Sequence, residues 1–109
     1  MTPSLPRIQV LNDATGRRLD LTWETGERTI IDLGEYIARG GIFRQLNDPK
    51  IFATAKLDDR HRVIEWHDPK HPRTVLADMD ADTLLHLARQ QGMLKRLSEI
   101  LQRNSDPVS

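Results

Sequence analysis

The feature that most constrains the fold is a strict alternation of apolar and polar residues early in the chain. Leu19, Leu21 and Trp23 alternate with polar neighbours, which is the period of a strand with one buried and one solvated face. Gly26 follows, and glycine supplies the positive φ that a tight turn needs. Residues 28–33 are again rich in apolar and β-branched side chains. Residues 19–33 therefore predict an antiparallel hairpin.

Two further regions have the pattern of strands. Residues 7–10 alternate apolar and polar side chains between Pro6 and an Asn-Asp pair, which predicts a first strand. Residues 55–57 and 62–66 flank a polar stretch and predict a second hairpin. In its second arm we expect Val63 and Glu65 on one face, and Ile64 and Trp66 on the other.

Helical signals are short in the middle of the chain and long at its end. Residues 35–39 have room for one or two turns before a glycine pair, and Asp48-Pro49 is typical of an N-cap followed by proline at the first helical position. Asp80 is an N-cap candidate for a helix over residues 81–91, in which apolar residues recur at helical spacing. Gly92 either ends this helix or lies inside it, because an apolar stripe continues to Arg103.

The order of these segments sets the fold class. Strands, short helices, strands and then helices predict an α+β domain with an antiparallel sheet of four or five strands. With 109 residues, we expect one domain over residues 1–103 and a disordered tail over residues 104–109. Residues 67–73 contain two prolines and predict a surface loop.

Composition excludes several classes of function. The 16 Lys and Arg residues balance 16 Asp and Glu residues, so the chain lacks the basic excess that is typical of nucleic-acid-binding domains. We therefore regard nucleic acid as an unlikely partner. It has no Cys, which removes disulfides, thiol chemistry and Cys-ligated zinc. No apolar run approaches the roughly 20 residues of a membrane span. We expect a cytoplasmic protein that does not enter membranes.

A series of short motifs resembles a known family. In chain order they are Thr25-Gly26, Ile31-Asp32-Leu33, Gly41-Ile42-Phe43, Asp48-Pro49, Ile64-Glu65-Trp66 and Asp80-Ala81-Asp82-Thr83-Leu84. Together they resemble the small bacterial family of unknown function numbered 2442, over about residues 8–85, with residues 86–103 as a helical extension. The resemblance implies a compact α+β domain and no established reaction. Some relatives carry a helix-turn-helix module after this domain.

The chain departs from the family in two places. Residues 67–73 form a longer and more charged segment than the short turn that commonly follows Trp66 in the family. The segment after residue 85 is too short for the multi-helix module of larger relatives, so their DNA-binding function is not carried over. Within the family pattern we interpret Phe43, Phe52 and Trp66 as core aromatics, and Asp32 as either solvent-facing or capping a turn.

Candidate groups for catalysis or metal binding have simpler interpretations. His67 and His71 lie four residues apart and could ligate a metal, but Pro69 between them disfavours the helix that would bring them together. Asp58-Asp59 fits a turn, and Asp80 and Asp82 fit a helix start. We predict no catalytic, cofactor-binding or metal-ligating residue, so a small metal-dependent enzyme is the weakest alternative.

The C-terminal segment exceeds what a minimal domain requires. Its apolar residues are candidates for an interface: Leu87, Met93, Leu94, Leu97, Ile100 and Leu101. Its cations are candidates for a basic rim: Arg89, Lys95, Arg96 and Arg103. The stripe either covers the chain's own sheet or binds a second copy or another protein. We expect a non-enzymatic interaction or regulatory module, with a DNA-associated regulator as the alternative. The sequence names no small-molecule ligand.

Overall fold

The computed structural model describes residues 5–105, without the side chains of Lys95 and of residues 102–105. Its first half is an antiparallel meander of β1 (Ile8–Thr15), β2 (Arg18–Trp23) and β3 (Arg28–Asp32), with β2 in the centre. Leu19, Leu21 and Trp23 are buried, so the predicted alternation and hairpin are confirmed. The first strand is longer than predicted, because β1 pairs with β2 along its whole length despite two register shifts.

Three short helical segments follow the meander: α1 (Gly34–Ala38), the 3₁₀ helix η1 (Gly41–Asn47) and α2 (Pro49–Phe52). Asp48 caps α2 as predicted, since its carboxylate accepts a hydrogen bond from the Lys50 N–H at 2.9 Å. Asp32 is exposed and also caps a turn, because its Oδ1 accepts from the Gly34 N–H at 2.8 Å. Both interpretations offered for Asp32 therefore hold.

The second sheet contains β4 (Lys56–Leu57), β5 (Val63–His67) and β6 (Val75–Asp80), with β5 in the centre. Ile64 and Trp66 are buried, as the predicted second hairpin requires. The prediction of a single sheet of four or five strands was wrong: the chain forms two three-stranded antiparallel sheets. Helices α1, η1 and α2 separate the two meanders, and β6 was not predicted because alanine and aspartate are uncommon in strands.

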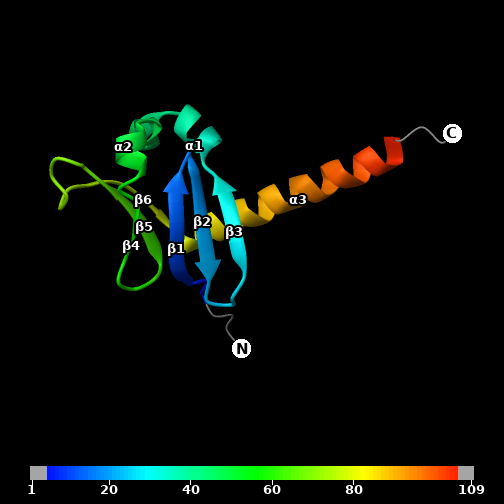
Figure 1. The fold of residues 1–109 in the computed structure, drawn as a ribbon, viewed down its shortest axis with the longest axis horizontal. Coiled ribbons are helices and arrows are strands. Elements are labelled where there is room, and N and C mark those ends of the chain that lie inside the picture. Colours follow the sequence, from blue (N-terminus) through cyan, green and yellow to red (C-terminus); the bar gives the residue numbers. More distant parts are fainter. Residues whose placement is uncertain (1–4, 106–109) are drawn as a thin grey trace.

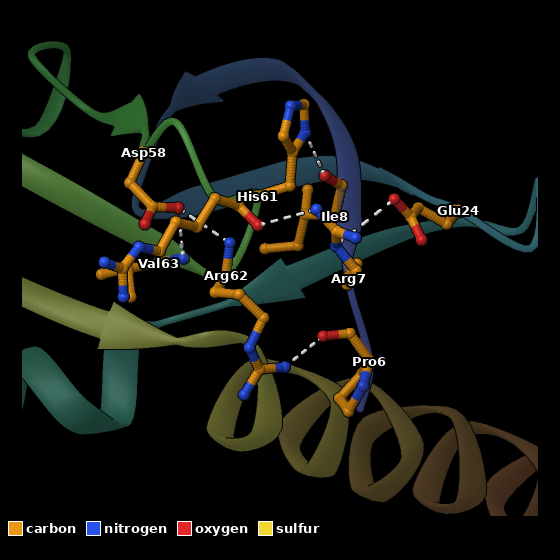
Figure 2. A network of polar contacts seen from close by, with 9 residues as sticks. Pro6, Arg7, Ile8, Glu24, Asp58, His61, Arg62 and Val63 are labelled. Carbon is orange, nitrogen blue, oxygen red and sulfur yellow. Dashed lines mark hydrogen bonds and ion pairs between the residues drawn. The ribbon is translucent and has the colours of Figure 1, made fainter. Parts of the chain in front are cut away.

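The turn between β4 and β5 joins the two sheets (Figure 2). The Ile8 N–H donates to the His61 carbonyl at 2.8 Å, and the His61 ring Nδ1 lies 2.8 Å from the Ile8 carbonyl. Asp58 holds the turn, because its Oδ1 accepts from the backbone N–H groups of Arg62 and Val63. Arg62 in turn donates to the Pro6 carbonyl. A stretch of polar turn residues thus fixes the start of β1 against the second sheet.

The last element, α3 (Ala81–Ser105), is one continuous helix of 25 residues. It begins at the predicted N-cap: the Thr83 N–H donates to the Asp80 carboxylate at 2.8 Å, and bonds from the Thr83 backbone and hydroxyl lower the pKa of Asp80. Gly92 lies inside the helix rather than ending it. The helix also includes Asn104 and Ser105, and the remainder of the predicted tail, residues 106–109, lies outside the described residues.

The two sheets and the first part of α3 share one core. Trp66 is its largest fully buried side chain and lies beside Phe52 at a ring-centroid distance of 5.9 Å. Phe43 is only partly buried and packs against the same cluster. Figure 1 shows the rest of α3 extending past β3 and away from the sheets, which gives the molecule its long dimension of 61 Å. Within residues 5–105, no helix is long and apolar enough to span a membrane.

Candidate functional site

The first half of α3 belongs to the core. Ala81, Leu84 and Leu87 are buried, and Leu85 and Ala88 are partly buried against the same cluster. Leu87 was predicted as an interface residue, but it is only 7% exposed in the chain itself. It therefore contributes to the chain's own packing and is removed from the candidate interface.

Gln91 marks the point at which the helix leaves the domain. Its side-chain amide donates to the Asp32 carbonyl at 2.8 Å and accepts from the Asp32 N–H at 2.9 Å. A neighbouring strand would form the same pair of bonds to one residue. Gln91 thus satisfies the backbone N–H and carbonyl of Asp32 at the end of β3, on the edge that no described strand covers. Beyond Gln91, every described side chain as far as Leu101 is exposed.

This exposed half of the helix carries an unusual number of large apolar side chains. Met93, Leu94, Leu97, Ile100 and Leu101 are each between 50% and 66% exposed. Single exposed apolar residues are ordinary, but a contiguous group on one helix face is typical of an interaction surface. We refer to these five residues as the exposed apolar face.

The centre of the exposed apolar face does not continue the side of α3 that packs on the core. At about 100° per residue, Leu97 at its centre points roughly 140° away from Leu84. Leu87, Leu94 and Leu101 recur every seven residues and were predicted as one stripe. The structure divides that stripe, because only Leu87 lies over the sheets. The domain therefore does not cover the exposed apolar face with its own side chains.

Cations line one side of this face. Arg89 and Arg96 are exposed, lie seven residues apart and so occupy nearly the same line along the helix. Among the described side chains neither forms an ion pair. Lys95 and Arg103, which were predicted as part of the same rim, have side chains outside the described residues. Glu99 lies three residues after Arg96 and so neighbours it on the helix surface, but no ion pair joins the two among the described side chains.

A pocket of about 580 Å³ adjoins the base of the same helix side. Its walls come from residues 5–7, from the turn between β2 and β3 and from α3, where Asp82, Leu85, His86 and Arg89 face it. These helix positions continue at spacings of three and four into Met93, Arg96 and Ile100. The pocket was not predicted, because its three segments are remote in sequence and no short motif marks them.

The other groups considered from the sequence do not converge on a reactive centre. His67 ends β5 and is mostly buried, with its Nε2 3.5 Å from Glu65, whereas His71 is exposed in the following loop. Burial tends to raise the pKa of Asp58, but the backbone N–H bonds that it accepts outweigh burial and lower it. Among the described residues, no three His, Asp or Glu side chains gather closely enough to hold a metal ion.

Comparison with known proteins identifies the domain that carries this helix. Residues 8–90 match the family model described as "Protein of unknown function (DUF2442)". The chain belongs to the DUF2442 family. The match ends at residue 90, immediately before Gln91 and the exposed apolar face. Among curated proteins, none matches the sequence.

One solved structure has the same fold as this DUF2442 chain. It is a protein from Nitrosomonas europaea described as a "Putative DNA Binding Protein", with a TM-score of 0.63 and 22% sequence identity. The alignment covers 98% of this chain and 66% of that protein, so the chain spans a little less than two thirds of its length. At this identity the likeness establishes a shared fold.

Proposed function

We propose that this DUF2442 chain is a non-enzymatic protein-interaction module that binds through the exposed apolar face of α3. The observation that carries the proposal is the exposure of five large apolar side chains on the half of α3 that extends away from the two sheets (Figure 1). Burying a Leu, Ile or Met side chain contributes roughly 1.5–3 kcal/mol. A partner that covers this face therefore gains hydrophobic free energy that the chain alone does not obtain.

The arrangement of the face suits a helical partner. Met93, Leu97 and Ile100 follow at spacings of four and three, as the a and d residues of a coiled coil do, and Leu94 and Leu101 widen the stripe. An apolar stripe of this width is typical of helices that pack against other helices. When no other partner is present, we expect a second copy of the chain to cover it.

Solution mass tests the proposal. We expect light scattering of the full chain at high concentration to give the mass of a dimer, and a chain ending at Gly92 to give that of a folded monomer. The shorter chain should fold, because it retains the buried part of α3 and the Gln91 bonds to Asp32. Leu97→Lys should also give a monomer, whereas Glu99→Lys, on the other side of the helix, should remain a dimer.

Two results would count against this proposal. A full chain that stays monomeric at every concentration would show that the exposed apolar face does not bind a second copy, which removes self-association as its function. A truncated chain that unfolds would show that residues 93–105 support the domain itself, in spite of their exposure. Circular dichroism on the same samples distinguishes these two results.

Association with DNA is the second candidate function. It is supported by the description of the Nitrosomonas europaea protein and by the exposed Arg89 and Arg96. The balanced charge of the whole chain argues against it. Binding to duplex DNA that weakens steeply with salt would favour this candidate, and no binding at low salt would remove it.

A further inference from the structure

The charges beside the exposed apolar face specify which kind of helix complements it. With Leu97 at an a position, Met93 and Ile100 take d positions, Leu94 and Leu101 take e positions, and Arg89 and Arg96 take g positions. Residues at e and g flank the contact between paired helices and select the partner through their charges. In this helix, one flank is basic and the other is apolar.

A second copy of the chain does not complement this flank. In a parallel pair, the g residues of one helix face the e residues of the other, so Arg96 meets leucine. In an antiparallel pair, g residues face each other, so arginine meets arginine. Glu99 takes a c position, away from the contact. In neither arrangement do Arg89 and Arg96 meet a carboxylate.

We propose that the exposed apolar face binds an acidic amphipathic helix, with Leu or Ile along its seam and Glu or Asp beside that seam. This inference rests on the function proposed above and names the chemistry of the partner. Arginine is suited to the role, because its guanidinium binds carboxylates in a bidentate manner while its stem covers apolar surface. The partner's carboxylates pair with Arg89 and Arg96, which have no ion-pair partner among the described side chains.

The pocket at the base of the helix defines where the partner ends. Arg89 belongs both to the basic flank and to the pocket wall, and the rest of that wall is partly apolar and partly acidic, with Leu85, Trp23, Glu24, Glu27 and Asp82. His86 and Gln90 are exposed and polar on the same side of α3, so the apolar contact stops between the face and the pocket. A helix of about three and a half turns covers the face from Leu101 back to Met93 and reaches Arg89, at about 3.6 residues per turn.

Two synthetic peptides test the proposal. Both have three heptads with Leu at a and d; one carries Glu at every e and g position, and the other carries Lys. Fluorescence anisotropy with the full chain should show the Glu peptide binding at least about 10-fold more tightly than the Lys peptide at low salt. The preference should shrink in 0.5 M NaCl, because salt screens exposed charges.

Variants assign the preference to the two arginines. Arg89→Glu/Arg96→Glu should reverse the order of the two peptides, whereas Arg73→Glu, an exposed change in the loop before β6, should leave it unchanged. A chain ending at Gly92 should bind neither peptide. Circular dichroism of each variant confirms that the domain is folded, so a lost preference is not mistaken for unfolding.

The outcomes separate this inference from the proposed function. Equal binding of both peptides by the full chain, or tighter binding of the Lys peptide, would overturn the acidic partner and leave the face as an interaction surface. Binding of neither peptide by a dimeric chain would also overturn it, in favour of a second copy. Binding of neither peptide by a chain that is monomeric at every concentration would contradict both proposals.

Discussion

Leu84→Ala should lower the free energy of unfolding by about 2–5 kcal/mol, whereas Leu97→Ala should change it by less than about 0.5 kcal/mol in the monomer. Leu84 is fully buried between α3 and the sheets, so its removal leaves a cavity. Leu97 is 52% exposed on the same helix. The two substitutions are chemically identical, so their difference measures how the two halves of α3 are used.

Urea denaturation at a concentration where the chain is monomeric provides this measurement. Leu97→Ala also serves as the control for helix propensity, because alanine is at least as good a helix former as leucine. Similar losses at both positions would mean that the exposed half of α3 also packs on the domain. That result would remove the basis of the proposed function.

Trp66→Ala should have a still larger effect and lower the free energy of unfolding by about 3–5 kcal/mol. The side chain is fully buried, lies next to Phe52 and links the second sheet to the shared core. Small domains have a total stability of about 5–15 kcal/mol. We therefore expect this variant to unfold in much less urea than the parent chain.

Trp66→Phe is the matched control. It keeps an aromatic ring beside Phe52 and removes the indole N–H, which is buried without a hydrogen-bond partner among the described residues. Because that unpaired N–H opposes burial, its loss offsets part of the smaller ring's lost packing. We expect less than half of the loss caused by alanine. Equal losses for both variants would show that the indole makes contacts that phenylalanine cannot replace.

The elements with strong local signals could be predicted from the sequence. The alternation at Leu19, Leu21 and Trp23 fixed both the pairing and the buried face of β2, and the aspartates at residues 48 and 80 marked helix starts. Strand β6 was missed, because its alternation is carried by Ala77 and Met79 between aspartates. The division into two sheets depends on contacts between distant segments, such as Ile8 with His61, which no local pattern predicts.

The candidate site was predicted in composition but not in position. The sequence identified the apolar residues of the C-terminal segment. It did not show which of them pack on the chain's own sheets and which are free to bind a partner, because that depends on where α3 leaves the domain. Leu87 lies on one side of that boundary and Leu94 on the other, although they share a heptad position. The phase of the helix held a usable signal, because Leu97 points away from the direction of Leu84.

The central claim is that a partner covers the exposed apolar face, and one labelling measurement tests it directly. The chain has no Cys, so Leu94→Cys and Glu99→Cys each provide a single site for a polarity-sensitive fluorophore. Adding unlabelled chain or the Glu peptide should shift emission at position 94 to the blue and leave position 99 unchanged. No shift at position 94 with either addition, or equal shifts at both positions, would contradict the account.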